Sequence, residues 1–232
     1  MFGFKTRVLI AAFIYAFIAI PESSAAPKSC QMDIPAVSVK HVSYEGVVKI
    51  NNGHSSSQLA QKFSNQHKLS RKAGWVTRGL TKTGLESRIE VVVTYRQIGR
   101  NQFCVGLQTV SSRIGYRLFN VYVAREFRPG SCEYRTTMAH ELNHVAIYRD
   151  QLRQYDPHFE RRIKGVSAGL RPVLSNSVKS GHTFFLKRIN SEVKILFTQL
   201  NKETDILQGR LDTPQNYRRE QALCPSAGRS LK

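Results

Sequence analysis

The chain changes its hydrophobic pattern once, near Arg128-Pro129-Gly130, and this change limits the folds open to it. Before that point, short stretches of β-branched and aromatic residues predict strands at 36–50, 89–95, 103–110 and 118–124. The polar segment 68–83 is expected to be an irregular or weakly paired connection. After it, apolar residues recur at helical spacing over long segments. Strands followed by helices predict an α+β domain, in which C-terminal helices pack on one side of a small antiparallel sheet.

Capping residues and prolines set the expected bounds of the helices. Ser55, with Gln58 three residues later, matches a capping box before a short helical pattern in the N-terminal half. Ser131 is the expected N-cap of the first C-terminal helix, which runs to about residue 155. Asp156-Pro157 is expected to break this helix, because proline lacks an N–H and clashes with the preceding turn. Further helices are expected at 158–168 and 184–211. The stretch after Asp212 is polar and is interpreted as a loop.

The N-terminal segment has the layout of a secretory signal peptide. Two cations precede an apolar run of 13 residues, Val8–Ile20, and small residues follow it. We expect cleavage after Ala25, so that residues 1–25 are removed and residues 26–232 form a single exported domain, periplasmic or secreted. The alternative is an uncleaved anchor, but a membrane span needs about 20 residues. We therefore expect no transmembrane segment in the mature chain.

Four cysteines follow the expected cleavage site, and they suggest an oxidising compartment. No Cys-x-x-Cys pair is present, which disfavours a thiolate zinc cluster. An even number predicts two disulfides, with three possible connectivities. We favour Cys104–Cys132, which closes a loop in the central region, and Cys30–Cys224, which joins the two ends of the mature chain.

One pentapeptide within the first C-terminal helix carries chemistry: His140-Glu141-Leu142-Asn143-His144. Two histidines at this spacing lie about 40° apart around a helix and about 6 Å apart along it, so both rings can bind one Zn²⁺. Glu141 lies outside the ligand set, close enough to take a proton from a water molecule on the metal. The pattern predicts a zinc metallopeptidase with a peptide or protein substrate. The alternative is a surface helix whose histidines bind no metal.

The sequence leaves the third zinc ligand open. Asp150, ten residues after His140, occupies the ligand position of the extended form of this motif. Ile147 stands where that form has glycine, so we expect the helix to continue and carry Asp150 about 15 Å along the axis from His140. A ligand from a following helix is the other common arrangement. The candidates of that kind are His158, Glu160, His182 and Glu192. Tyr148 has two interpretations, a group that assists the metal ligands or a buried structural side chain, and we favour the second.

Further segments accompany the pentapeptide: Gly74-Trp75-Val76-Thr77-Arg78-Gly79, Cys104, Tyr122-Val123-Ala124-Arg125-Glu126-Phe127, Cys132 and Val145-Ala146 after His144. Together they resemble a family of uncharacterised bacterial proteins described as predicted secreted zinc-dependent proteases. The likeness covers roughly residues 40–170. It implies a zincin-like α+β domain with zinc on His140 and His144 and with Glu141 as general base. It implies no particular substrate.

Positive charge is abundant, with 35 Lys and Arg against 16 Asp and Glu and a net charge of +19. It is spread along the chain, with concentrations at 68–82 and 161–164. Trp75 is the only aromatic residue in the first of these, so the stacking platform that nucleic-acid binding requires is missing, and we expect no nucleic acid partner. A second functional class stays open: a non-enzymatic periplasmic or envelope protein, with a structural or vestigial zinc site, that binds anionic envelope components through its basic surface. A basic surface that binds only solvent and counterions is the simplest interpretation.

Overall fold

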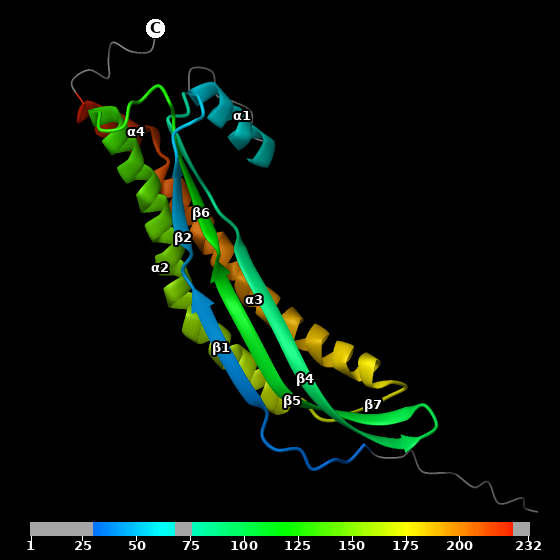
Figure 1. Ribbon diagram of the computed structural model, residues 1–232. Coiled ribbons are helices and arrows are strands. Elements are labelled where there is room, and N and C mark those ends of the chain that lie inside the picture. Colours follow the sequence, from blue (N-terminus) through cyan, green and yellow to red (C-terminus); the bar gives the residue numbers. More distant parts are fainter. Residues whose placement is uncertain (1–29, 68–75, 225–232) are drawn as a thin grey trace, which may run out of the picture.

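The computed structural model describes residues 30–67 and 76–224 (Figure 1). Its strands are β1 (Ser38–Tyr44), β2 (Val47–Asn51), β3 (Gly79–Lys82), β4 (Leu85–Gly99), β5 (Gln102–Tyr116), β6 (Leu118–Val123) and β7 (Val173–Ser175). Its helices are α1 (Ser56–His67), α2 (Cys132–Gly169), α3 (Val178–Leu211) and α4 (Pro214–Ala222). The expected signal peptide, residues 1–25, lies outside the described residues, as do Gly74 and Trp75.

The strands form two sheets that lie end to end, because the chain passes from a strand of one sheet directly into a strand of the other (Figure 1). In the first, β5 lies between β1 and β4, and β7 pairs with the beginning of β5; in the second, β6 lies between β2 and β3. β3 and β4 are antiparallel to their partners, whereas β1 and β2 are parallel to theirs. The expectation of an antiparallel sheet is therefore wrong for this edge. The reason is that β1 and β2 continue in one direction instead of folding into a hairpin.

A glycine interrupts the parallel edge between β1 and β2. Gly46 has a φ of +71°, and a Cβ there would lie 2.4 Å from the carbonyl oxygen of Tyr116, so both the conformation and the close approach require glycine. Arg149 on α2 donates hydrogen bonds to the carbonyl oxygens of Glu45 at 3.1 Å and Gly46 at 2.7 Å. These two hydrogen bonds attach the segment between β1 and β2 to α2.

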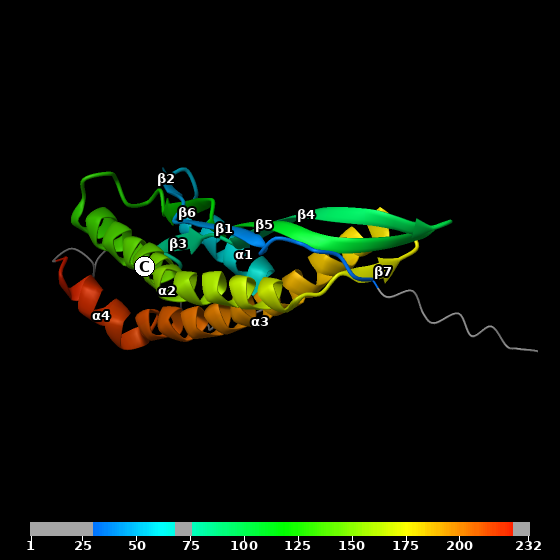
Figure 2. The ribbon, with the colours of Figure 1, turned by 90° about the horizontal axis from the view of Figure 1, so that it is seen from below.

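The long helices α2 and α3 run side by side along one face of the sheets (Figures 1 and 2), as the α+β prediction requires. With 38 and 34 residues they are about 57 Å and 51 Å long. They bury a continuous apolar core against the strands, which includes Val105, Val110, Ile114, Leu152, Phe159, Ile163, Phe185, Ile189 and Leu200. None of the described helices combines the length and the apolar character that crossing a lipid bilayer requires.

Two predicted helix starts are confirmed. Ser55 and Gln58 form the reciprocal capping box at α1, with N–H to side-chain oxygen distances of 3.2 Å and 2.9 Å. Ser131 caps α2 by accepting a hydrogen bond from the N–H of Tyr134 at 3.1 Å. Local sequence signals therefore place both helix starts.

The predicted break at Asp156-Pro157 is wrong, because α2 continues through it to Gly169. Proline in a helix interior costs about 3 kcal/mol relative to alanine. Fully buried side chains on both sides of Pro157 pack into the common core, and their burial offsets this cost. They are Leu152, Phe159 and Ile163.

A polar network also fastens α2 at this point. The ring of His41 on β1 lies between Asp156, whose Oδ1 is 2.9 Å from Nε2, and Ser112 on β5, whose Oγ is 2.7 Å from Nδ1. Serine hydrolases combine the same three residue types. Ser112 is only 1% exposed, however, so its hydroxyl does not face a substrate. The network is structural and joins α2, β1 and β5.

The chain contains the two predicted disulfides, but the favoured connectivity is wrong. Cys30 is bonded to Cys104, and Cys132 is bonded to Cys224. Cys104 lies near the start of β5, beside β7, whereas Cys132 begins α2, whose length separates it from β7 (Figure 1). The length of α2 therefore prevents the expected bond between Cys104 and Cys132. Two disulfides are typical of proteins that fold in oxidising compartments.

Candidate metal centre

The predicted pentapeptide lies in the first half of α2 with its chemical groups turned inward. His140, Glu141 and His144 are 3%, 4% and 8% exposed. Since two histidines four residues apart share one side of a helix, their rings meet edge to face with centroids 4.8 Å apart. The interior position of these polar side chains requires partners for each of them.

Asp212, at the end of α3, completes a three-residue group with the two histidines. Its Oδ1 lies 3.1 Å from Nε2 of His140 and 3.2 Å from Nε2 of His144, and the two Nε2 atoms are 3.1 Å apart. Donor atoms lie about 3.3 Å apart in tetrahedral zinc sites and about 3.0 Å apart in octahedral sites. The nearly equilateral triangle fits both. Among the described residues, this is the group that can hold a metal ion.

Hydrogen bonds at the opposite ring nitrogens fix the orientation of both histidines. The side-chain Nε2 of Gln208 donates to the carbonyl oxygen of His144 at 3.1 Å, which turns its Oε1 toward Nδ1 of the same histidine. Because that amide oxygen only accepts, Nδ1 of His144 carries the proton. Nδ1 of His140 faces the carboxylate of Glu220 at 3.0 Å, with the same result. In the neutral rings, both Nε2 lone pairs point at Asp212.

The electrostatics of the group favour a cation. Burial lowers the pKa of His140, but hydrogen bonds to Asp212 and Glu220 outweigh it and raise the pKa to about 9. Burial likewise lowers the pKa of His144, but the hydrogen bond and the charge of Asp212 raise it by more, so that the net shift is upward. Burial raises the pKa of Asp212, yet both histidines hold it well below its usual range. The centre therefore stabilises positive charge among its three donor atoms.

Glu141 faces β3 instead of joining the metal-binding triangle. Its Oε2 accepts a hydrogen bond from Oγ1 of Thr81 at 2.8 Å. A Cβ at Gly79 would lie 2.4 Å from Oε1 of Glu141, so only glycine leaves room for this carboxylate. Burial raises the pKa of Glu141 to about 7, against the lowering effect of His144 and the Thr81 hydrogen bond. Residues 79–82, expected to be irregular or weakly paired, form a short strand paired with β6, and this strand holds Glu141.

Helix α4, where a loop was expected, supplies two further contacts to the centre. The hydroxyl of Tyr217 donates to Oδ1 of Asp212 at 2.5 Å, and its ring lies 4.9 Å from that of His140. Glu220, one turn further along, holds His140. The signal for this helix is Thr213-Pro214, an N-cap residue followed by proline at the first helical position. This dipeptide also marks Asp212 as the residue between two helices.

The third ligands suggested by the sequence all lie outside the group. The three acidic candidates form ion pairs with arginine or lysine: Asp150 with Arg153, Glu160 with Lys164, and Glu192 with Arg162 and Arg188. Of the two histidines, His158 contacts Arg161 through Nδ1, and His182 lies in the first turns of α3. Tyr148 has the structural role that we favoured, because it packs against Tyr116 and Phe119 with ring centroids 5.3 Å and 5.9 Å away. The residue at the end of the following helix that completes the candidate group is Asp212.

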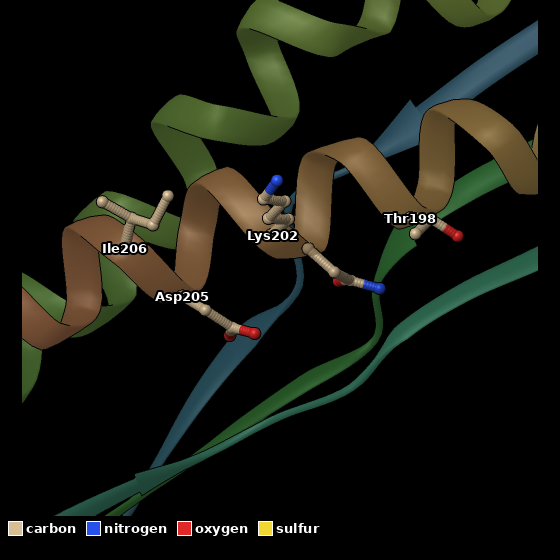
Figure 3. A pocket seen from close by; sticks show the side chains of 5 residues that line it. Thr198, Lys202, Asp205 and Ile206 are labelled. Carbon is tan, nitrogen blue, oxygen red and sulfur yellow. The ribbon is translucent and has the colours of Figure 1, made fainter.

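A surface hollow lies elsewhere on α3. It has a volume of about 570 Å³ and is lined by side chains from successive turns of the helix (Figure 3): Thr198, Asn201, Lys202, Asp205 and Ile206. It contains one carboxylate and one ammonium group and no histidine. We assign it no part in the chemistry of the centre.

The fold and the site define an α+β protein with a candidate metal centre of two histidines and one carboxylate. A comparison with described protein families, with curated proteins and with solved structures found no significant match to this chain.

Proposed function

We propose that the protein is an exported zinc-dependent peptidase, in which His140, His144 and Asp212 bind the metal and Glu141 is the general base. The observation that carries the proposal is the triangle of donor atoms with edges of 3.1 to 3.2 Å, formed directly beside a buried glutamate. It extends the resemblance to predicted secreted zinc-dependent proteases, which rests on the sequence.

Two imidazoles and one carboxylate are a donor set that catalytic zinc sites use. The same set also binds Fe²⁺ in oxygen-dependent enzymes. Glu141 supports zinc, because hydrolysis needs a carboxylate beside the metal ligands that accepts and returns a proton. Zinc bound by three protein ligands supplies a water molecule with a pKa of about 7 and polarises a carbonyl group.

The roles of the surrounding side chains follow from their contacts. Thr81 holds Oε2 of Glu141 and so orients the carboxylate, which would take a proton from the attacking water and return it to the leaving amine. Gln208 and Glu220 keep the rings of His144 and His140 in the orientation that ligation needs. Within the described part of the chain, β3 pairs with β6 alone, so its outer edge offers backbone groups to an extended peptide.

The experiment that tests this proposal compares metal content and peptide cleavage in four proteins. Purified wild type is expected to contain one equivalent of zinc and to cleave unfolded polypeptide, and His140→Ala to do neither. Glu141→Gln is expected to keep the zinc and lose cleavage. His158→Ala, an exposed histidine on the same helix, is the matched control and should behave as wild type. Iron in place of zinc, or cleavage that survives Glu141→Gln, would contradict the proposal.

One observation supports the second functional class, a non-enzymatic envelope protein. Glu141 is only 4% exposed, which suits a structural metal site better than an open one. Structural zinc sites are closed by four protein ligands, however, and the group has three among the described residues. Zinc binding without cleavage of any polypeptide would favour this class. Its binding to anionic polymers should weaken steeply with salt.

A further inference from the structure

Helix α4 spans the interval between the metal-binding triangle and the Cys132–Cys224 disulfide. It begins two residues after Asp212 and ends two residues before Cys224. On α2, Cys132 precedes His140 by eight residues, which is about 12 Å along the helix axis. The nine residues of α4 cover about 13 Å. One end of α4 is therefore at the metal ligands and the other at the disulfide, beside the start of α2 (Figure 1).

Between these ends, α4 presents its two polar contacts to the ligands. The Tyr217 hydroxyl binds Asp212 at 2.5 Å, and the Glu220 carboxylate lies 3.0 Å from Nδ1 of His140. Both contacts act on atoms of the ligand residues, so they hold the triangle without belonging to it. Their geometry depends on where α4 lies.

Little in the packing of α4 fixes that position. None of its nine residues is buried, and Leu223 behind it is 68% exposed. A helix this short is not stable by itself in water. Its N-terminus is capped by Thr213 and attached to the end of α3 through Asn216. At its other end, the covalent link to α2 is the disulfide.

We propose that the Cys132–Cys224 disulfide sets the metal affinity of the His140–His144–Asp212 group by holding Tyr217 and Glu220 against it. The inference rests on the proposed metal site and adds a redox dependence to it. A dithiol that reduces this bond transfers two electrons and two protons to the cysteines and becomes a disulfide itself. With the bond broken, α4 leaves α2, and loss of its contacts weakens metal binding by about 10- to 100-fold.

The chain provides its own matched control, because the second disulfide, Cys30–Cys104, lies at the far end of the sheets. Zinc affinity is measured by competition with a chromophoric chelator for wild type and for two double variants. Cys132→Ser with Cys224→Ser is expected to bind zinc at least about 10-fold more weakly. Cys30→Ser with Cys104→Ser should retain wild-type affinity, although it too loses a disulfide. Serine avoids thiols that bind zinc themselves.

A second measurement covers the case in which the first double variant does not fold. The Cys30→Ser, Cys104→Ser protein is titrated with zinc before and after reduction by a phosphine, which then acts on the Cys132–Cys224 bond alone. The two released thiols are alkylated before the titration, so that they bind no zinc. Glu220→Gln and Tyr217→Phe, with the disulfide intact, should each reproduce part of the loss. Adding Glu220→Gln to the variant without the Cys132–Cys224 bond should cause no further loss.

The outcomes separate this inference from the proposed function. Equal zinc affinity with and without the Cys132–Cys224 bond overturns the inference and leaves the metal site standing. Equal weakening in both double variants also overturns it, because the effect would then be one of general stability. If oxidised wild type binds no zinc, both the metal site and its redox dependence are wrong.

Discussion

At the scale of single residues, the centre depends on groups that decide where protons lie. Gln208 is one of them. Its amide nitrogen donates a hydrogen bond to the carbonyl oxygen of His144, so its amide oxygen faces Nδ1 of the same residue and accepts the proton there. The lone pair on Nε2 of that ring is then available to a metal ion. A residue about eight helical turns along α3 from its N-terminus thus selects the tautomer of a histidine on α2.

Gln208→Leu should therefore lower zinc affinity by about 10- to 100-fold, because the ring of His144 loses its orienting acceptor. Chelator competition measures the change. Gln151→Leu is the control, since Gln151 is similarly buried but its Oε1 has no hydrogen-bond partner among the described residues. If both variants lose affinity equally, Gln208 has no specific role in orienting the ring.

Thr81→Val removes the hydroxyl that holds Glu141 and keeps the volume of the side chain. The Thr81 hydrogen bond lowers the pKa of Glu141, so without it the pKa rises above about 7. The ionised base is then present only at higher pH, and the acidic limb of the kcat/KM profile should move upward. Zinc content should not change, and Thr81→Ser should restore the wild-type profile. An unshifted limb would remove Thr81 from this role.

At the scale of elements, the sequence signals were reliable where they were local. Ser55 with Gln58 and Ser131 mark helix starts that the structure confirms, because caps depend on the few residues around them. The predicted helix break at Pro157 is wrong, because it rested on a local preference that distant contacts outweigh. That preference is overridden by side chains of β5, β1 and α3, which are distant in sequence and keep α2 intact.

The continuous helix has a measurable consequence. Pro157→Ala restores a helical N–H and should raise the free energy of unfolding by about 2 kcal/mol, the propensity gain of about 3 kcal/mol less up to about 1 kcal/mol for the freer unfolded chain. Urea denaturation followed by circular dichroism gives the change. Pro214→Ala serves as control, because proline is favoured at the first position of α4 and its removal should not stabilise. An unchanged midpoint for Pro157→Ala would mean that the helix is broken there.

At the scale of the whole molecule, the antiparallel pair α2 and α3 determines what the sequence could predict of the site. His140, Glu141 and His144 were identified because one helix turn brings them together. Asp212 lies 68 residues beyond His144 and meets it only because α3 runs back alongside α2. No local pattern encodes that return, so the third ligand, the disulfide pairs and the parallel edge of the sheet required the fold.

Because its ligands come from two helices, the metal should stabilise the whole fold. Zinc at about 100 times its dissociation constant is expected to add about 2.7 kcal/mol to the free energy of unfolding, and a chelator should remove that gain. Thermal denaturation with and without zinc measures it. His158→Ala should respond as wild type does, whereas a zinc response in His140→Ala would show that the ion binds elsewhere.

The pairing of the disulfides carries a consequence for how the protein matures. The first cysteine of the chain is bonded to the second, and the third to the fourth. An oxidant that joins cysteines in the order in which they leave the ribosome or a membrane channel therefore makes both native bonds without reshuffling. Since Cys224 is the last of the four, the Cys132–Cys224 bond beside the candidate metal centre closes after the Cys30–Cys104 bond. The candidate centre is therefore completed only after the other disulfide has formed.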